Sequence, residues 1–221
     1  MHESIQNLNS ITNKVKEIID SNNLNTDPKI IAVTKTFEVN KIVPLLEKGH
    51  LHFGENKIQE AENKWMQLRK TYTNIKLHMI GKLQSNKAKK AVMLFDYIHS
   101  LDNFKLASKI SQYENQLNKK TKIFIQVNVA GENQKSGIQL KEVNKFYEYC
   151  KKNLSLNIIG LMNLPPADKD ASEYFKILQN KSQELNLNHL SMGMSSDYDK
   201  AILYGSTFLR LGSAILGKRK I

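Results

Sequence analysis

The sequence predicts a parallel α/β fold, and within that class a single closed (β/α)₈ TIM barrel with an extra N-terminal helix. Short runs rich in valine, isoleucine and leucine occur eight times along the 221 residues. Runs that are apolar on both faces are typical of buried parallel strands. Stretches with apolar residues three and four positions apart lie between most of these runs, as expected for helices that pack on a sheet. Eight such units favour a closed barrel, and the open doubly wound sheet is the structural alternative.

The first half of the chain begins with an expected helix over residues 1–24, whose apolar stripe consists of Ile5, Leu8, Ile11, Val15 and Ile18. Expected strands follow at 30–34, 50–54, 76–81 and 96–101. Apolar stripes at 39–46, 58–68 and 106–117 predict helices after the first, second and fourth of them.

The second half has expected strands at 122–129, 156–163, 189–194 and 208–213. Apolar stripes at 143–147 and 174–185 predict the helices that follow the fifth and sixth strands. The length is slightly below that of a typical barrel of this kind, and no linker-like change in composition interrupts it. We therefore expect one domain over residues 1–221.

Composition limits the class of protein further. Hydrophobic residues make up 40% and charged residues 24%, which is typical of globular chains. The formal net charge of +12 could attract nucleic acid or phosphorylated molecules, but the lysines are spread along the chain without interleaved aromatic residues. We interpret them mainly as solvated helix faces. We expect no nucleic-acid partner, no membrane-spanning segment and no signal peptide.

The chain has a single cysteine, Cys150, so no intrachain disulfide can form. This favours a reducing, cytoplasmic location, and a buried structural thiol is the expected state of Cys150.

In this barrel, active sites form at the carboxyl ends of the strands. Lys35 follows the first strand, and burial of its stem would lower the pKa of its amine and make it a nucleophile toward carbonyl groups. The structural alternative is a surface lysine at the start of a loop. Other strand ends supply further polar candidates, which are Glu55, Asn56, Lys82, Asp102, Asn128, Asn163 and Arg210.

The loops after the seventh and eighth strands often hold a phosphate in such barrels. Here they read GMSSD at 193–197 and RLGSAILG at 210–217. Ser195 and Ser196 supply hydroxyl groups at an expected helix start, where backbone N–H groups are also free. Gly212 allows an anion to approach the backbone, and Ser213 adds a hydroxyl group. Helix capping is the structural alternative for these serines.

Other catalytic patterns are weak. Five of the six histidines lie in or beside strand-like runs and none has metal-ligand spacing with cysteine or carboxylates, so we expect core or strand-end histidines and no metal site. The chain contains neither a P-loop nor a GxGxxG motif.

Eight segments in the same order resemble the pyridoxal-phosphate homeostasis proteins, the YggS/PROSC-like family, over almost the full length. They are IIAVTKT at 30–36, HFGEN at 52–56, HMIGKLQSNK at 78–87, SLD at 100–102, IQVNVAGENQKSG at 125–137, IIGLMNLPP at 158–166, LSMGMSSDY at 190–198 and RLGSAILG at 210–217.

The resemblance implies the barrel of the N-terminal half of alanine racemase, with pyridoxal 5′-phosphate bound as a Schiff base to Lys35. It implies that Asn56 lies near the cofactor, and that Ser195, Gly212 and Ser213 hold its phosphate. Arg210 would face the pyridine nitrogen. Thr34 and Ser213 replace a commoner serine and a commoner threonine of the family, and both keep a hydroxyl group.

The family's role is to hold and supply the cofactor in vitamin B6 homeostasis, without robust catalysis. An arginine beside the ring nitrogen keeps that nitrogen unprotonated, which disfavours carbanion chemistry. The tyrosine base that racemases bring with a second domain is not expected in a chain of this length. We expect a monomer that hands the cofactor to apo-enzymes. The alternatives are a pyridoxal-phosphate-dependent amino-acid racemase, a Schiff-base aldolase without cofactor, and a nucleic-acid binder. Whether Lys82, Lys87 or Lys135 forms a second cofactor site stays open.

Overall fold

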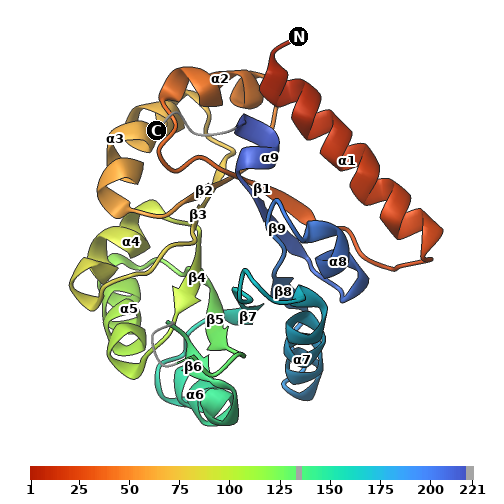
Figure 1. The fold of residues 1–221 in the computed structure, drawn as a ribbon. Coiled ribbons are helices and arrows are strands. Elements are labelled where there is room, and N and C mark those ends of the chain that lie inside the picture. Colours follow the sequence, from red (N-terminus) through yellow and green to blue (C-terminus); the bar gives the residue numbers. More distant parts are fainter. Residues whose placement is uncertain (133–135, 218–221) are drawn as a thin grey trace.

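A closed barrel of eight parallel strands forms the centre of the molecule, as a computed structural model shows for residues 1–132 and 136–217 (Figure 1). Each strand pairs with its neighbour, and β1 pairs with β9 to close the ring. This confirms the predicted (β/α)₈ architecture. The strands are β1 (Lys29–Val33), β2 (His52–Glu55), β3 (Lys76–Met79), β4 (Tyr97–Leu101), β5 (Lys122–Asn128), β7 (Ile158–Met162), β8 (His189–Ser191) and β9 (Phe208–Leu211).

Every apolar run identified in the sequence overlaps one of these strands. A further two-residue strand, β6 (Ile138–Gln139), pairs with the end of β5 outside the barrel ring. Lys135, one of the lysines considered for a second site, lies outside the described residues.

Helices surround the barrel on its outer face (Figure 1). The predicted stripes correspond to α1, α2, α3, α5, α6 and α7. The sequence patterns gave no stripe for α4, α8 or α9, which have only four to seven residues each. Helix α6 is equally short, but the chain continues from it as a π-helix through Asn153, so its apolar face belongs to a longer helical segment. The helices are α1 (Glu3–Ser21), α2 (Val39–Glu47), α3 (Ile58–Thr71), α4 (Ala88–Leu94), α5 (Phe104–Leu117), α6 (Val143–Glu148), α7 (Ala171–Glu184), α8 (Tyr198–Leu203) and α9 (Ser213–Leu216).

The N-terminal helix α1 lies across the outside of the barrel beside α8 and α9 (Figure 1). Leu8, Ile11 and Val15 are buried, so the predicted stripe of α1 is its buried face, and the helix packs against α2, α8 and α9 of the outer layer. None of the helices in the described part of the chain is long and apolar enough to cross a membrane. Cys150 is buried, and burial raises the pKa of its thiol to about 12, as expected for a structural cysteine.

Two apolar layers result from the alternation of side chains along each strand. The larger layer fills the space between the barrel and the helices. The smaller one lies inside the barrel and consists of Ile31, Tyr97, Phe124, Met162 and Phe208. Polar side chains also occupy the interior, among them the fully buried His78 and His99 and the nearly buried Arg210. These polar groups lead from the apolar core to the carboxyl ends of the strands.

Candidate functional site

A cavity of about 590 Å³ opens at the carboxyl ends of the strands. Three of the predicted site residues, Lys35, Asn56 and Arg210, line it together. Ser195 and Gly212 lie next to this cavity. Ser195 directly follows the lining residue Met194, and an ideal Cβ built on Gly212 would lie 3.5 Å from Cβ of the lining residue Val33. The remaining lining residues are Ile80, Gly81, Lys82, Gln126, Val127, Asn128, Ser136, Leu164, Pro165 and Ala167.

Lys35 lies in a tight turn at the end of β1. The Phe37 N–H donates to the Thr34 carbonyl oxygen at 3.1 Å, which makes Lys35 the first central residue of the turn. Thr36 is the second, with φ at 67°, a left-handed conformation that is rare for a β-branched residue. A turn with positive φ at this position is usually built with glycine or asparagine. The half-buried Lys35 is therefore presented by a strained turn.

Glu55 holds this turn in place through hydrogen bonds on the side away from the cavity. Its fully buried carboxylate oxygen Oε1 accepts hydrogen bonds from the Thr34 hydroxyl at 2.7 Å, from Trp65 Nε1 at 2.9 Å and from Lys64 Nζ at 3.1 Å. Lys64 also donates to the Thr34 carbonyl oxygen at 2.6 Å. The sequence marked Glu55 as one strand-end candidate without a role. The structure places it behind the site, where it holds the ends of β1 and β2 together with α3.

Asn56 follows Glu55 and faces the cavity. Its side-chain Oδ1 is buried and has no hydrogen-bond partner among the described residues. The loop after β3 passes so close to Asn56 that a Cβ on Gly81 would lie only 2.3 Å from the Asn56 carbonyl oxygen. Only glycine fits at position 81. The Asn56 amide oxygen is thus a buried acceptor that no described residue uses.

Arg210 projects from β9 and is 4% exposed. Its guanidinium donates to Ser191 Oγ at 2.7 Å and to the Asn163 carbonyl oxygen at 2.8 Å. Burial lowers its pKa to about 10, with Asp197 acting in the opposite direction, so the group is charged at neutral pH. No carboxylate in the described ranges lies within 4.0 Å of it. A buried cation held by neutral dipoles favours an electron-rich ligand in the cavity.

The loops after β8 and β9 meet beside this cavity. Ser195 Oγ accepts a hydrogen bond from the Ala214 N–H at 3.2 Å, which joins the two loops. The backbone N–H groups of Ser195, Ser196 and Ser213 donate no hydrogen bond within the described residues. Gly212 directly precedes Ser213, and a Cβ there would make only ordinary contacts, the nearest at 3.5 Å, with Val33. Packing therefore does not require glycine at 212, whereas close approach of a ligand would.

The expected helix start at Ser195 and Ser196 is wrong in detail. Helix α8 begins at Tyr198 with Asp197 as its N-cap residue, and both serines lie in the preceding turn. The Asp197 carboxylate accepts from the Met194 N–H at 2.6 Å, and this contact holds the turn. Burial raises the pKa of Asp197. The Ser195 hydroxyl contributes instead to the start of α9, at Ala214, 19 positions further along the chain.

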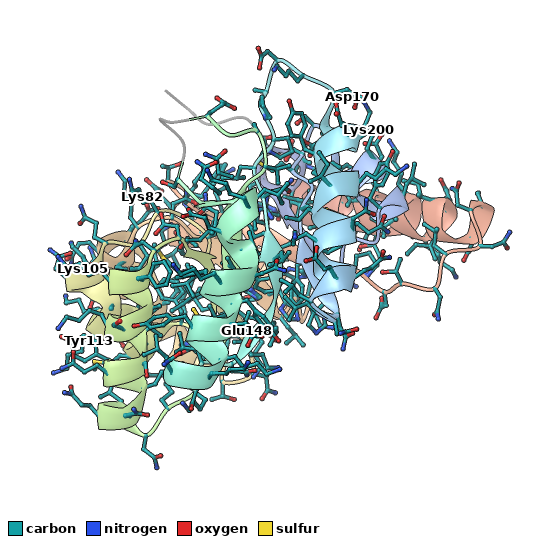
Figure 2. The ribbon with its side chains drawn as sticks, turned by 90° about the horizontal axis from the view of Figure 1, so that it is seen from below. Lys82, Lys105, Tyr113, Glu148, Asp170 and Lys200 are labelled. Carbon is teal, nitrogen blue, oxygen red and sulfur yellow. The ribbon has the colours of Figure 1, made fainter. Side chains whose placement is uncertain are left out.

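A second hollow of about 720 Å³ adjoins the cavity, and Lys82 lines both. Lys82 lies on the same side of the molecule as Lys105 of α5 (Figure 2). On another side, Asp170 and Lys200 form an exposed 2.8 Å ion pair that ties the start of α7 to α8 (Figure 2). Such an exposed pair contributes little stability. No group of three or more potential metal ligands occurs in the described part of the chain.

The fold and the residues at the mouth define a protein of the alanine racemase N-terminal-domain class, whose family model matches residues 6–220. Within that class, the chain belongs to the pyridoxal phosphate homeostasis protein family. It is 33% identical to the Haemophilus influenzae member, over 96% of this chain and 94% of that protein. It is 36% identical to the Synechocystis member, over 86% of this chain and 91% of that protein.

Solved structures agree with this assignment. PipY of Synechococcus elongatus without PLP is 32% identical and superimposes with a TM-score of 0.82, covering 92% of this chain and all of PipY. The structure of PipY with PLP bound gives a TM-score of 0.78 at 31% identity, with the same coverage. Alanine racemase of Clostridium difficile shares the fold, with a TM-score of 0.72 at 16% identity over 99% of this chain and 57% of the racemase.

Proposed function

We propose that this protein binds pyridoxal 5′-phosphate, holds it as a Schiff base on Lys35, and takes part in intracellular vitamin B6 homeostasis without robust catalysis of its own. The observation that carries the proposal is the convergence of Lys35, Asn56 and Arg210 on one cavity at the barrel mouth. The bound cofactor supplies an aldehyde, which condenses with a primary amine and releases water. The PLP-bound structure of PipY and the names of the homologues support this assignment.

The residues present fit each part of the cofactor. Lys35 supplies the amine from the strained turn after β1. The backbone N–H groups of Ser195, Ser196 and Ser213, which have no partner among the described residues, and the neighbouring Gly212 suit a phosphate dianion. The buried Oδ1 of Asn56 is an acceptor with no partner in the described part of the chain, as expected for a group that binds a ligand.

Arg210 accounts for the absence of robust catalysis. A guanidinium can only donate hydrogen bonds, so beside a pyridine nitrogen it keeps that nitrogen unprotonated. An unprotonated ring withdraws electrons weakly, and proton abstraction from a bound amino acid is disfavoured. Among the described residues that line the cavity there is also no tyrosine or histidine to act as a second base. The site is therefore suited to holding and releasing the cofactor. We also propose a cytoplasmic location, which the single cysteine favours.

The test is borohydride reduction of the protein after incubation with pyridoxal 5′-phosphate, followed by peptide mass spectrometry. We expect a near-visible absorption band and one pyridoxyl-phosphate adduct on Lys35. Lys35→Ala should lose both, while the matched control Lys82→Ala, which changes another lysine of the same cavity, should keep both. An adduct confined to another lysine would contradict the assignment. Transfer to apo-enzymes is tested by recovery of their activity with the loaded protein as the sole source of cofactor.

The racemase alternative makes a different prediction. Lys35-dependent loss of optical activity in D- or L-alanine would establish it, and we expect none. Light scattering at several protein concentrations tests the proposed monomer, which predicts a mass of 25.3 kDa throughout.

A further inference from the structure

Three histidines form a continuous series of hydrogen bonds across the barrel interior and end behind Arg210. His52 Nδ1 lies 3.0 Å from His78 Nε2, and His78 Nδ1 lies 2.9 Å from His99 Nε2. His99 Nδ1 lies 2.8 Å from Ser191 Oγ, which accepts from Arg210 at 2.7 Å. The series crosses β2, β3 and β4 and reaches β8 and β9. None of these histidines lines the cavity, and the proposed function does not use them.

We propose that this series positions Arg210, and that Arg210 in turn sets one tautomer, with the proton on Nε2, in all three histidines. The tautomers of the three histidines are a property of the protein without any ligand. The effect of the histidines on ligand binding rests on the proposed function, because they hold the guanidinium toward the cavity that would bind the cofactor.

The direction of the hydrogen bonds follows from the chemistry of the two ends. Arg210 can only donate, so Ser191 Oγ is an acceptor in that bond. The buried Ser191 hydroxyl must then donate its own proton, and His99 Nδ1 is the remaining partner within the described residues. The opposite direction would leave a buried hydroxyl proton without an acceptor, which is costly. His99 is therefore protonated on Nε2.

The same reasoning extends along the series. His99 Nε2–H donates to His78 Nδ1, so the proton of His78 is on Nε2. That group donates to His52 Nδ1, so His52 is also protonated on Nε2. The half-buried His52 then presents its N–H at the opposite end of the series, where it is accessible to water. A charged histidine would place two donors face to face at one of these links, so the series holds only when all three rings are neutral.

Ring stacking holds the imidazoles in this arrangement. His78 stacks on Tyr97 with ring centroids 4.3 Å apart, and His99 stacks on Phe124 at 4.3 Å. Burial lowers the pKa of both histidines well below the usual value, and Arg210 contributes further to this effect at His99. Both observations agree with neutral rings in fixed orientations.

Nuclear magnetic resonance can test the tautomers directly in the cofactor-free protein. Long-range ¹H–¹⁵N spectra of histidine-labelled protein at pH 7 distinguish a protonated from an unprotonated ring nitrogen. We expect an Nε2–H signature for His52, His78 and His99. A predominant Nδ1–H form or a charged ring at any of the three would overturn the proposal. This result does not depend on cofactor binding, so it can fail while the proposed function stands, and the reverse is equally possible.

Two substitutions of His99 separate the two halves of the series. The amide of His99→Asn occupies roughly the position of Nδ1 and can accept from Ser191, whereas that of His99→Gln reaches the position of Nε2 and can donate only toward His78. We expect His99→Asn to retain pyridoxal 5′-phosphate affinity within about threefold. We expect His99→Gln to lose roughly tenfold, which is the size of one buried hydrogen bond.

Ser191→Ala removes the direct support of Arg210 and should also weaken binding about tenfold. It should in addition move the cofactor absorption band and speed solvent exchange of the Arg210 side-chain N–H groups in the cofactor-free protein. Ser100→Ala is the matched control, because Ser100 is a fully buried barrel serine whose hydroxyl has no partner in the described residues. Equal effects of Ser191→Ala and Ser100→Ala on affinity and on Arg210 exchange would overturn the positioning role.

Discussion

The Thr34 hydroxyl donates a 2.7 Å hydrogen bond to the buried Oε1 of Glu55, and this bond links the ends of two neighbouring strands. Thr34 comes directly before Lys35, and Glu55 comes directly before Asn56. One contact beneath the cavity therefore places two of the residues that line it. Lys64 and Trp65 of α3 bond to the same carboxylate oxygen, so the outer helix layer contributes to the position of the site.

Glu55→Gln tests this anchor. The amide keeps the shape but removes the buried negative charge beside Lys64, whose side chain is 10% exposed and which also pairs with Glu60 at 2.6 Å. We expect a loss of about 2–4 kcal/mol in the free energy of unfolding, measured by urea denaturation. The exposed Glu47→Gln is the control and should stay within about 0.5 kcal/mol of the wild type. Indistinguishable unfolding curves for the two variants would show that Glu55 is not an anchor.

Gly212→Ala tests whether glycine at position 212 is required for cofactor binding or for the stability of the fold. A Cβ at 212 meets its nearest protein atom at 3.5 Å, so the free energy of unfolding should change by less than about 1 kcal/mol. Affinity for pyridoxal 5′-phosphate should fall at least tenfold if the backbone approaches the phosphate. Gly160→Ala is the contrasting variant, because its Cβ would lie 2.0 Å from the His189 carbonyl oxygen and should destabilise the fold itself. Unchanged affinity in Gly212→Ala would remove this residue from the phosphate site.

The turn that presents Lys35 stores backbone strain at Thr36, whose φ is 67°. Thr36→Gly should relieve strain of the order of 1 kcal/mol, which is partly offset by the greater freedom of glycine in the unfolded chain. Thr36→Val keeps the branched Cβ but loses the 2.6 Å hydrogen bond of Thr36 Oγ1 to the Lys35 carbonyl oxygen. We expect thermal unfolding to rank glycine above valine. The reverse order would mean that the hydroxyl contact outweighs the strain.

Acid should destabilise the protein before most carboxylates titrate. Burial lowers the pKa of His52 to about 4 and those of His78 and His99 well below 6.5. Unfolded histidines take up protons below about pH 6.5 and these folded ones do not, so the free energy of unfolding falls as pH decreases from 6.5 to 5. Each contributes a slope of up to about 1.4 kcal/mol per pH unit. Urea denaturation at several pH values measures the slope. His78→Phe should reduce it by the contribution of one histidine, because one fewer proton is taken up on unfolding. A flat profile would contradict neutral buried histidines.

Much of the barrel could be predicted from local patterns. A strand buried on both faces must be apolar at nearly every position, and this is why β1 and β5 are recognisable as continuous runs. The position of Lys35 directly after such a run was enough to place it at the mouth. Helices α4, α8 and α9 were not predicted, because each is an isolated segment of one or two turns with too few apolar positions to define a period. Helix α6 is as short but was predicted, because a π-helix through Asn153 continues it.

The sequence by itself therefore determined the order of strands and helices, the edge of the barrel that carries the polar residues, and the family. Only the tertiary structure decided which polar groups meet. Ser195 contacts Ala214, Glu55 contacts Trp65, and His99 contacts Ser191 across 92 positions of sequence. Burial periodicity is a property of each segment and can be read locally, whereas these hydrogen bonds depend on strand register and on closure of the ring, which no single segment specifies.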